Sequence, residues 1–136
     1  MTGIVIVSHS RPLATAAVDL ASQMLRSGGP RIEVAAGLSD TELGTDAAAI
    51  QTAIEAAMDD QGVVVLMDLG SAIMSAEMAV EMLDEDDAAR VRLSWAPLVE
   101  GLIGAAVTAA GGADRKEVAT QAELAAEAKR MQVTGG

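Results

Sequence analysis

The sequence GIVIVSHS, residues 3–10, is an almost continuous apolar run that is rich in β-branched residues and ends in serine and histidine. Runs of this kind are typical of strands that are covered on both faces, as in a parallel sheet. The sequence GVVVLMDLGS, residues 62–71, repeats the pattern and passes into an aspartate. These stretches predict two central strands, Gly3–Ser8 and Gly62–Asp68, and they decide the fold class.

Two further stretches, Arg31–Ala36 and Val91–Trp95, also have the composition of strands. Segments with helical periodicity lie between the four predicted strands. Helices are expected from Pro12 to the Gly28-Gly29-Pro30 stop, and over about residues 46–58, 71–83, 98–110 and 114–130. This alternation predicts an α/β protein with a single doubly wound, mainly parallel sheet of about four strands, flanked by helices on both faces.

Helical spacing also predicts which apolar side chains face the core. The expected inward-facing sets are Leu13, Ala17, Leu20 and Met24; Ile50, Ile54 and Met58; and Val99, Ile103, Ala106 and Ala110. The stripe of Met74, Met78 and Met82 is also expected to pack in the core, with a groove for a partner as the alternative. We expect residues 1–136 to form one domain, with a frayed tail at 131–136. The acidic run at residues 84–87 is interpreted as a solvated loop, with a docking site as the alternative.

Composition excludes several functions. The chain has 136 residues and 9 Lys and Arg against 20 Asp and Glu, a net charge of −11. This acidity, with Trp95 as the only aromatic residue, argues against nucleic-acid binding. There is no cysteine, and His9 is the only histidine, so thiolate chemistry and sites that need two histidines are excluded. No apolar run is long enough to span a membrane and no secretion signal is evident, so a cytoplasmic protein without membrane insertion is expected.

Two polar residues follow the two central strands. His9 comes after the first and Asp68 ends the other, and ligands of open parallel sheets bind at the carboxyl ends of the strands. If the strands are neighbours, the carboxylate can accept the Nδ1 proton and leave Nε2 as a nucleophile. Each residue precedes a helix N-terminus, which favours an anion such as a phosphoryl group.

Each residue has a plainer interpretation as well. A lone histidine at a strand end can be a surface residue, and Asp68 can be a helix cap. Ser10, Gly70 and Ser71 can serve only as turn and cap residues. A receiver domain is disfavoured, because Ser8-His9-Ser10 cannot supply the acidic Mg²⁺ ligands that it needs. No glycine-rich nucleotide loop is present, and no metal or cofactor is expected.

Four strings in order carry a family resemblance: GIVIVSHS at 3–10, LGT at 43–45, LMDLGSA at 66–72 and APLVEG at 96–101. Over about residues 3–111 the chain resembles the DhaM-type phosphotransferase subunits of bacterial dihydroxyacetone kinases. These are relatives of the IIA domains of mannose-family phosphotransferase systems (PTS EIIA mannose-type domains).

The resemblance implies that His9 is phosphorylated, that Asp68 orients it, and that Gly70 and Ser71 help to bind the phosphoryl group. Ser10 and Thr45 are further candidate phosphate contacts, although Asp46 places a negative charge beside Thr45. The resemblance also implies a homodimer, the phosphocarrier HPr as donor, and ADP on the nucleotide-binding subunit of the kinase as acceptor.

Two other functions stay open at this point. The chain could be the IIA component of a mannose-type transporter, which donates to a IIB protein from the same histidine. It could also be a non-catalytic regulatory or binding module that has kept the fold but carries no phosphoryl group.

Overall fold

Four parallel strands form the centre of the protein. A computed structural model describes residues 1–26 and 28–136. The strands are β1 (Gly3–Ser8), β2 (Ile32–Ala36), β3 (Val63–Met67) and β4 (Val91–Ser94). Their order in the sheet is β2-β1-β3-β4, and each pair runs parallel. The predicted α/β fold with a parallel sheet of four strands is confirmed.

The strand order reverses between β1 and β3. After β1 the chain crosses to β2 on one side, and it then returns to β3 on the other side of β1. In the β1–β3 pair Val7 lies opposite Met67, so β3 ends within one residue of the end of β1. The residues that follow them, His9 and Asp68, are therefore brought to one point of the sheet edge.

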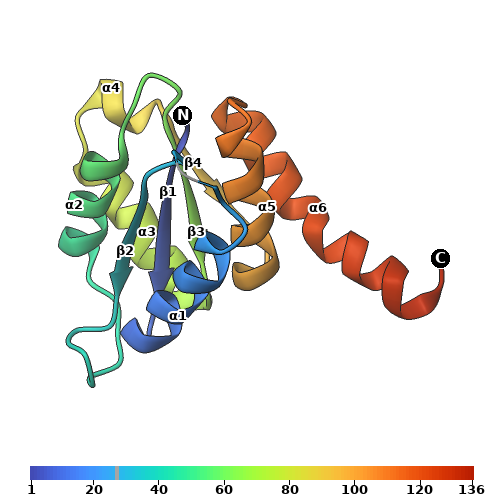
Figure 1. Ribbon diagram of the computed structural model, residues 1–136. Helices are drawn as coiled ribbons and strands as arrows, with labels where there is room; N and C mark the ends of the chain where they lie inside the picture. The colour runs from blue at the N-terminus through green and yellow to red at the C-terminus, as the bar shows by residue number, and fades with distance from the viewer. Residues whose placement is uncertain (27) are drawn as a thin grey trace.

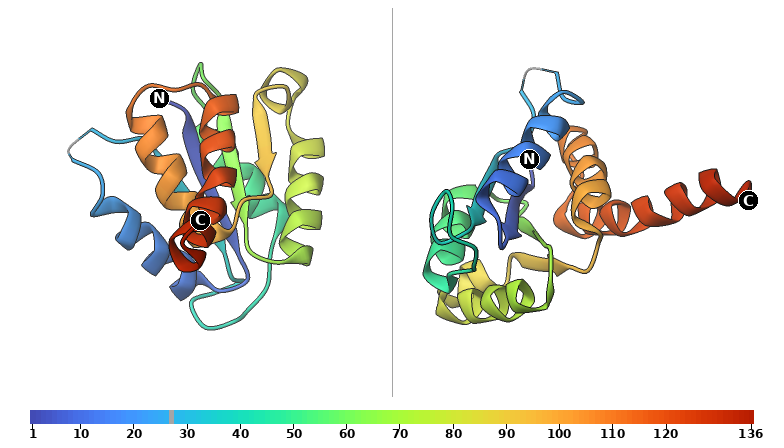
Figure 2. Two further views of the ribbon diagram at one scale, coloured as in Figure 1. Left: turned by 90° about the vertical axis from the view of Figure 1, so that its right-hand side faces the viewer. Right: turned by 90° about the horizontal axis from the view of Figure 1, so that it is seen from below.

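Helices cover both faces of the sheet (Figures 1 and 2). One face carries α1 (Arg11–Ser22), α5 (Leu98–Ala110) and α6 (Arg115–Thr134). The other face carries α2 (Ala47–Ala57), α3 (Gly70–Met82) and the short α4 (Glu85–Ala88). The second half of α6 extends away from the body of the molecule (Figure 1).

The core consists of two apolar layers, because alternate strand residues point to opposite faces. Ile4, Ile6, Val64 and Leu66 pack under α1, α5 and α6. Val5, Val7, Val63 and Val65 pack under α2 and α3. The helices meet the sheet mainly through alanines, which let the backbones approach closely.

Because alanines rather than larger side chains face the sheet, several of the predicted inward-facing sets are wrong. Helix α1 buries the predicted Ala17 together with Ala14 and Ala21, whereas Leu13, Leu20 and Met24 are about half exposed. Helix α3 likewise buries Ala72, Ala76 and Ala79, and its methionine stripe, predicted to be core, lies outside: Met74 is 70% exposed. Helix α5 buries Leu102, Ala105 and Ala109 beside the predicted Ala106, and it leaves Val99 exposed. The prediction for α2 is confirmed at Ile50 and Ile54, and Met58 packs against the same layer.

Three boundaries also differ from prediction. Helix α1 ends at Ser22, before the Gly28-Gly29-Pro30 stop, and Ser27 lies outside the described residues. Helix α6 continues to Thr134 rather than ending near Arg130, and Gly135 caps it in a left-handed conformation. The acidic run at 84–87 is not simply a loop, because Asp84 caps the short α4.

Among the described residues no helix has the length and apolarity needed to cross a membrane.

Candidate active site

His9 and Asp68 form the centre of the site, at the carboxyl ends of β1 and β3. The imidazole Nδ1 lies 2.9 Å from the Asp68 Oδ1 atom. The Asp68 N–H donates to the Val7 carbonyl at 3.1 Å, which continues the β1–β3 ladder and holds the carboxylate beside the ring. Both side chains are mostly covered, with 24% of His9 and 14% of Asp68 exposed. The predicted juxtaposition of these two residues is confirmed by the geometry.

The Asp68 carboxylate is held by four hydrogen bonds. Besides the ring, the backbone N–H of His9 donates to Oδ2 at 3.0 Å, the Ser8 hydroxyl donates to Oδ2 at 2.9 Å, and the Leu69 N–H donates to Oδ1 at 2.7 Å. Partial burial raises the pKa of Asp68, but the donors from His9, Ser8 and Leu69 outweigh it, so the pKa is lowered below its ordinary value. The carboxyl is therefore ionised at neutral pH.

The charge of Asp68 decides the tautomer of His9. An ionised carboxylate can only accept hydrogen bonds, so Nδ1 of the neutral ring must carry the proton. The other nitrogen, Nε2, then holds the lone pair. Because Nδ1 is anchored, the ring is held with Nε2 directed away from the carboxylate.

Ser8 is a site residue to which the sequence reasoning assigned no role. It is fully buried, donates its hydroxyl hydrogen to Asp68, and accepts the Ser10 N–H at 3.1 Å. Its side chain thus positions the carboxylate. The sequence did contain a signal for this role, because Ser8 is the one hydroxyl residue at the end of an otherwise apolar strand. A polar group buried in such a strand requires a hydrogen-bond partner.

Ser71 and the start of α3 lie at the exposed nitrogen of His9. The Ser71 hydroxyl is hydrogen-bonded to Nε2. In the described part of the chain, the N–H groups of Gly70 and Ser71 donate to no protein acceptor, and the N-cap residue Leu69 makes no side-chain cap. These groups stand at the positive end of a helix of 13 residues, so they favour an anion beside Nε2.

The remaining predicted residues lie near the site but have other partners. Ser10 caps α1 by accepting the Leu13 N–H at 3.3 Å. The Thr45 hydroxyl is hydrogen-bonded to Ser75 of α3 at 2.7 Å, and Asp46 caps α2. The structure therefore gives neither Ser10 nor Thr45 a contact with the ring of His9.

The loop between β2 and α2 is hydrogen-bonded to the backbone of His9. The Gly44 N–H donates to the His9 carbonyl at 3.0 Å. Gly44 has a φ of +146°, and a Cβ atom there would lie 2.9 Å from the Leu38 side chain. Only glycine fits this position without strain.

The arrangement places the Nε2 lone pair, a candidate nucleophile, next to a helix end whose N–H groups favour an anion. The lone pair on Nε2 can attack an electrophile, and Asp68 stabilises the positive charge that the ring then acquires. Free N–H groups and the Ser71 hydroxyl are placed to contact anionic oxygens. Among the described residues, no three His, Asp or Glu side chains are grouped as a metal site would require.

The fold and this site define a domain of the phosphotransferase-system IIA type. The chain belongs to the EIIA-man family, whose model, described as PTS system fructose IIA component, matches residues 3–119.

Individual relatives narrow the comparison further than the family model does. The chain is 49% identical over 135 residues to the phosphoryl donor subunit DhaM of the PEP-dependent dihydroxyacetone kinase of Escherichia coli K12, covering 98% of this chain and 29% of that protein. It is 35% identical over 109 residues to the corresponding subunit of dihydroxyacetone kinase 2 of Listeria innocua, covering 79% of this chain and 85% of that one. The chain thus spans less than a third of the E. coli relative.

Solved structures agree on the fold. The crystal structure of the unknown function protein EF1359 has a TM-score of 0.74 and 30% identity, covering 90% of this chain and 94% of that one. A sigma-54 interaction domain protein from Enterococcus faecalis has a TM-score of 0.69 over 96% of this chain and 94% of its own, but its 14% identity supports the fold alone.

Proposed function

We propose that this chain is a phosphohistidine carrier that accepts a phosphoryl group from HPr on His9 and passes it to ADP. The ADP is bound on the nucleotide-binding subunit of a dihydroxyacetone kinase, so the carrier supports phosphorylation of dihydroxyacetone. The proposal includes a cytoplasmic location and a homodimer. It rests on one observation: Asp68 holds His9 with Nε2 free of the carboxylate and next to the start of α3.

The loading step follows from this geometry. The lone pair of Nε2 attacks the phosphorus of the phosphoryl group on the donor, and an N–P bond forms while the bond from phosphorus to the donor breaks. The electron pair of that bond leaves with the donor. The incoming group displaces the Ser71 hydroxyl from Nε2, and this hydroxyl and the N–H groups of Gly70 and Ser71 become donors to the phosphoryl oxygens.

The unloading step reverses the roles. An oxygen of the terminal phosphate of ADP attacks phosphorus, the N–P bond breaks, and its electron pair returns to Nε2. Asp68 keeps the Nδ1 proton in place through both steps, so the ring ends in the same tautomer in which it started. No proton has to be stored on the protein between the two steps.

The relatives favour this acceptor over a IIB protein. Proteins that are 49% and 35% identical to the chain are named phosphoryl donor subunits of dihydroxyacetone kinases. Ser10 and Thr45 remain outer candidates for phosphate contact in the proposal, since each would have to exchange its present partner to reach the group.

The test is a phosphoryl relay with purified components. The protein is mixed with labelled phosphoenolpyruvate, enzyme I and HPr, and the label on the chain is followed before and after acid treatment. We expect an acid-labile phosphoryl group on wild type and none on His9→Ala. The label should then drain to the ADP-loaded kinase subunit.

Three results would contradict parts of this proposal. An unlabelled wild type beside a working control carrier would leave only the non-catalytic interpretation. Label that survives in His9→Ala would move the site elsewhere. Label that drains to a IIB protein but not to the kinase subunit would make the chain a transporter component.

A further inference from the structure

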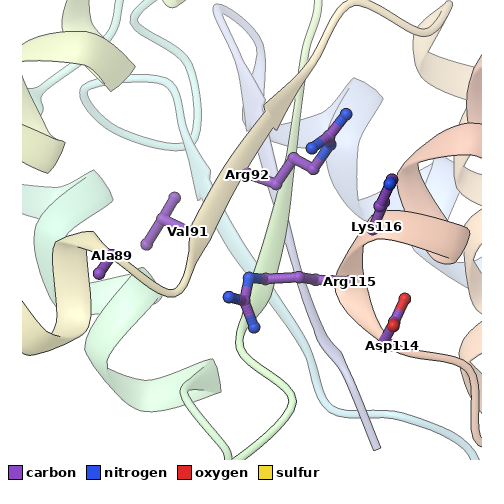
Figure 3. Close-up of a pocket in the computed structure, with 6 residues that line it drawn as sticks. All are labelled: Ala89, Val91, Arg92, Asp114, Arg115 and Lys116. Atoms are coloured by element: carbon purple, nitrogen blue, oxygen red, sulfur yellow. The ribbon is translucent and has the colours of Figure 1, made fainter.

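The anion contacts available beside His9 come from the start of α3 rather than from cations. Arg11 is the cation closest to His9 along the chain, and its guanidinium is hydrogen-bonded to Asp40 at 3.1 Å. Other cations gather at the amino ends of β4 and α6, at the opposite end of the sheet (Figure 3): Arg92, Arg115 and Lys116. In the described part of the chain, no Lys or Arg side chain is hydrogen-bonded to a residue of the site. The position of α3 relative to His9 therefore decides how well a phosphoryl group is held.

Apolar packing fixes the position of α3 along its axis only weakly. Its buried residues are Ala72, Ala76 and Ala79. Packed elements resist sliding when ridges of side chains fit into the grooves of a neighbour, and alanine methyl groups form shallow ridges. At its far end Gln51 of α2 donates to the Met82 carbonyl at 3.1 Å, but that contact lies about three turns from the start of the helix. Another contact is needed to position the first turn.

Two serine hydroxyls of α3 bond to residues outside the helix. Ser71 is hydrogen-bonded to His9, and Ser75, one turn later, is hydrogen-bonded to Thr45 at 2.7 Å. Residues four positions apart share a face of a helix, so the two serines lie one above the other. Hydroxyls on the other helices bond instead to a carbonyl of their own helix, as in Thr52, Thr120 and Thr134. The Ser75 hydroxyl thus connects α3 to a different part of the fold.

Thr45 is held on both sides by its neighbours in the chain. The Gly44 N–H donates to the His9 carbonyl at 3.0 Å, and Asp46 caps α2 by accepting the Ala48 N–H at 3.0 Å. Three consecutive residues therefore hold three elements: the end of β1, helix α3 and the start of α2. The Thr45 hydroxyl has a defined place from which it can hold α3 relative to His9.

We propose that Thr45 is a positioning residue of the carrier, which acts through Ser75 to hold the start of α3 at the distance from His9 that a phosphoryl group requires. This inference rests on the proposed function. A phosphoryl group on Nε2 displaces the Ser71 hydroxyl, so the contact between the first turn of α3 and the ring is lost on loading. The Thr45–Ser75 hydrogen bond is then the side-chain contact of α3 nearest to the site in the described part of the chain. In this role Thr45 touches no phosphoryl oxygen.

The first experiment measures labelling of the chain by phosphorylated HPr at increasing HPr concentration. Thr45→Val keeps the shape of the side chain and removes its hydroxyl, and Ser75→Ala removes the partner hydroxyl. Each should lower the maximal rate by about 10–100-fold, because a small misplacement of the groups around the reacting atoms has an effect of this order. The HPr concentration that gives half of the maximal rate should stay within about twofold, because uniform binding of the donor is unchanged.

Three further variants distinguish positioning from other roles. Thr45→Ser retains the hydroxyl and should restore the wild-type rate. The double variant of Thr45→Val and Ser75→Ala should be no slower than either single variant, because both changes remove the same hydrogen bond. Thr52→Val makes the matched substitution at a hydroxyl that bonds within α2, and it should label like wild type. Urea titration of every preparation should give a midpoint close to that of wild type, since the Ser75 hydroxyl left alone can turn to a carbonyl of its own helix.

A second measurement needs no phosphoryl donor. His9 is the only histidine, so ¹⁵N-labelled histidine reports on this one imidazole ring. Thr45→Val and Ser75→Ala should move the Nε2 resonance toward its position in Ser71→Ala, because all three changes weaken the contact of Ser71 with the ring. Thr52→Val should leave the resonance in place. The resonance can be read even if the chain takes no label, so failure of the proposed function and failure of the positioning role are distinguishable.

Three results would overturn the inference. A wild-type rate and an unchanged Nε2 resonance in both single variants would show that the hydrogen bond does not position α3. A slow Thr45→Val beside a Ser75→Ala that labels at the wild-type rate would make Thr45 a direct phosphate contact. A double variant whose loss equals the product of the two single losses would show that the two hydroxyls act independently.

Discussion

Asp68→Asn is the sharpest test of the site, because it keeps the size of the side chain and changes only its charge and hydrogen-bonding capacity. The carboxylate accepts four hydrogen bonds, two on each oxygen. The asparagine amide has one accepting oxygen and one donating nitrogen. In either orientation of the amide, its nitrogen, itself a donor, faces two groups that donate hydrogen bonds in the wild type.

Each orientation has a defined cost. With nitrogen in the place of Oδ2, the Ser8 hydroxyl can turn and accept, but the backbone N–H of His9 loses its partner. With nitrogen in the place of Oδ1, the Leu69 N–H loses its partner and the ring must move its proton to Nε2, which removes the nucleophile. One unsatisfied N–H costs about 1–3 kcal/mol, so we expect the free energy of unfolding to fall by about that amount.

The effect on transfer should be larger than the effect on stability. Removing the charge withdraws the stabilisation of the positive ring and permits the wrong tautomer. The same change in a serine hydrolase triad lowers kcat by about 10⁴, and we expect phosphoryl transfer from HPr to fall by about 10²–10⁴. By transition-state theory this corresponds to about 2.7–5.5 kcal/mol on the barrier.

Rapid-quench measurement of label transfer, with urea unfolding on the same preparation, separates the two effects. The matched control is Asp84→Asn, which makes the same substitution at the exposed cap of α4 and should leave transfer unchanged. A folded Asp68→Asn that accepts the phosphoryl group at the wild-type rate would refute the role of Asp68 in holding the tautomer.

Four further predictions follow from the contacts. Ser8→Ala removes a donor to Asp68 and should lower the free energy of unfolding by about 1.5–3 kcal/mol in urea titrations; an unchanged midpoint would show that the buried hydroxyl is not needed. Because the pKa of Asp68 is lowered in the folded state, its contribution to stability should be complete above the pKa of the unfolded chain and be lost as pH falls through the folded value, so wild type should lose more stability on acidification than Asp68→Asn. Ser71→Ala should leave stability within about 0.5 kcal/mol but slow labelling of His9 in the relay assay, since the partly exposed hydroxyl bonded to Nε2 is lost; an unaffected rate would leave the helix N–H groups as the only donors. Ile6→Ala, in the fully buried centre of β1, should cost about 2–5 kcal/mol by the same titration, and a smaller loss would mean that the two core layers repack.

Much of the fold could be predicted because the strands are strongly patterned. Apolar runs with β-branched residues at Gly3–Ser8 and Val63–Met67 are long enough to be recognised without tertiary information. The caps at Asp46 and Asp114 are local features, since each side chain accepts a backbone N–H from a residue two or three positions on. These signals fixed the element order and the fold class.

The helix faces could not be predicted in the same way. Helices α1 and α3 have two apolar faces each, one of alanines and one of larger side chains. A sequence pattern ranks the larger face as more hydrophobic, but a close helix–sheet approach favours the smaller one. Burial of Ala72 and exposure of Met74 are therefore outcomes of packing distance, which no local pattern contains.

The sequence by itself determined that a lone histidine and an aspartate each follow a buried strand and precede a helix, and that a parallel sheet must bring strand ends to one edge. Only the tertiary structure decided that β1 and β3 are neighbours, that the buried Ser8 holds the carboxylate, and that Thr45 bonds to Ser75 rather than to the site. The physical reason is range. Turns, caps and strand patterns act over a few residues, whereas the contact of Asp68 with His9 spans 59 positions and exists only once strand order and register are set.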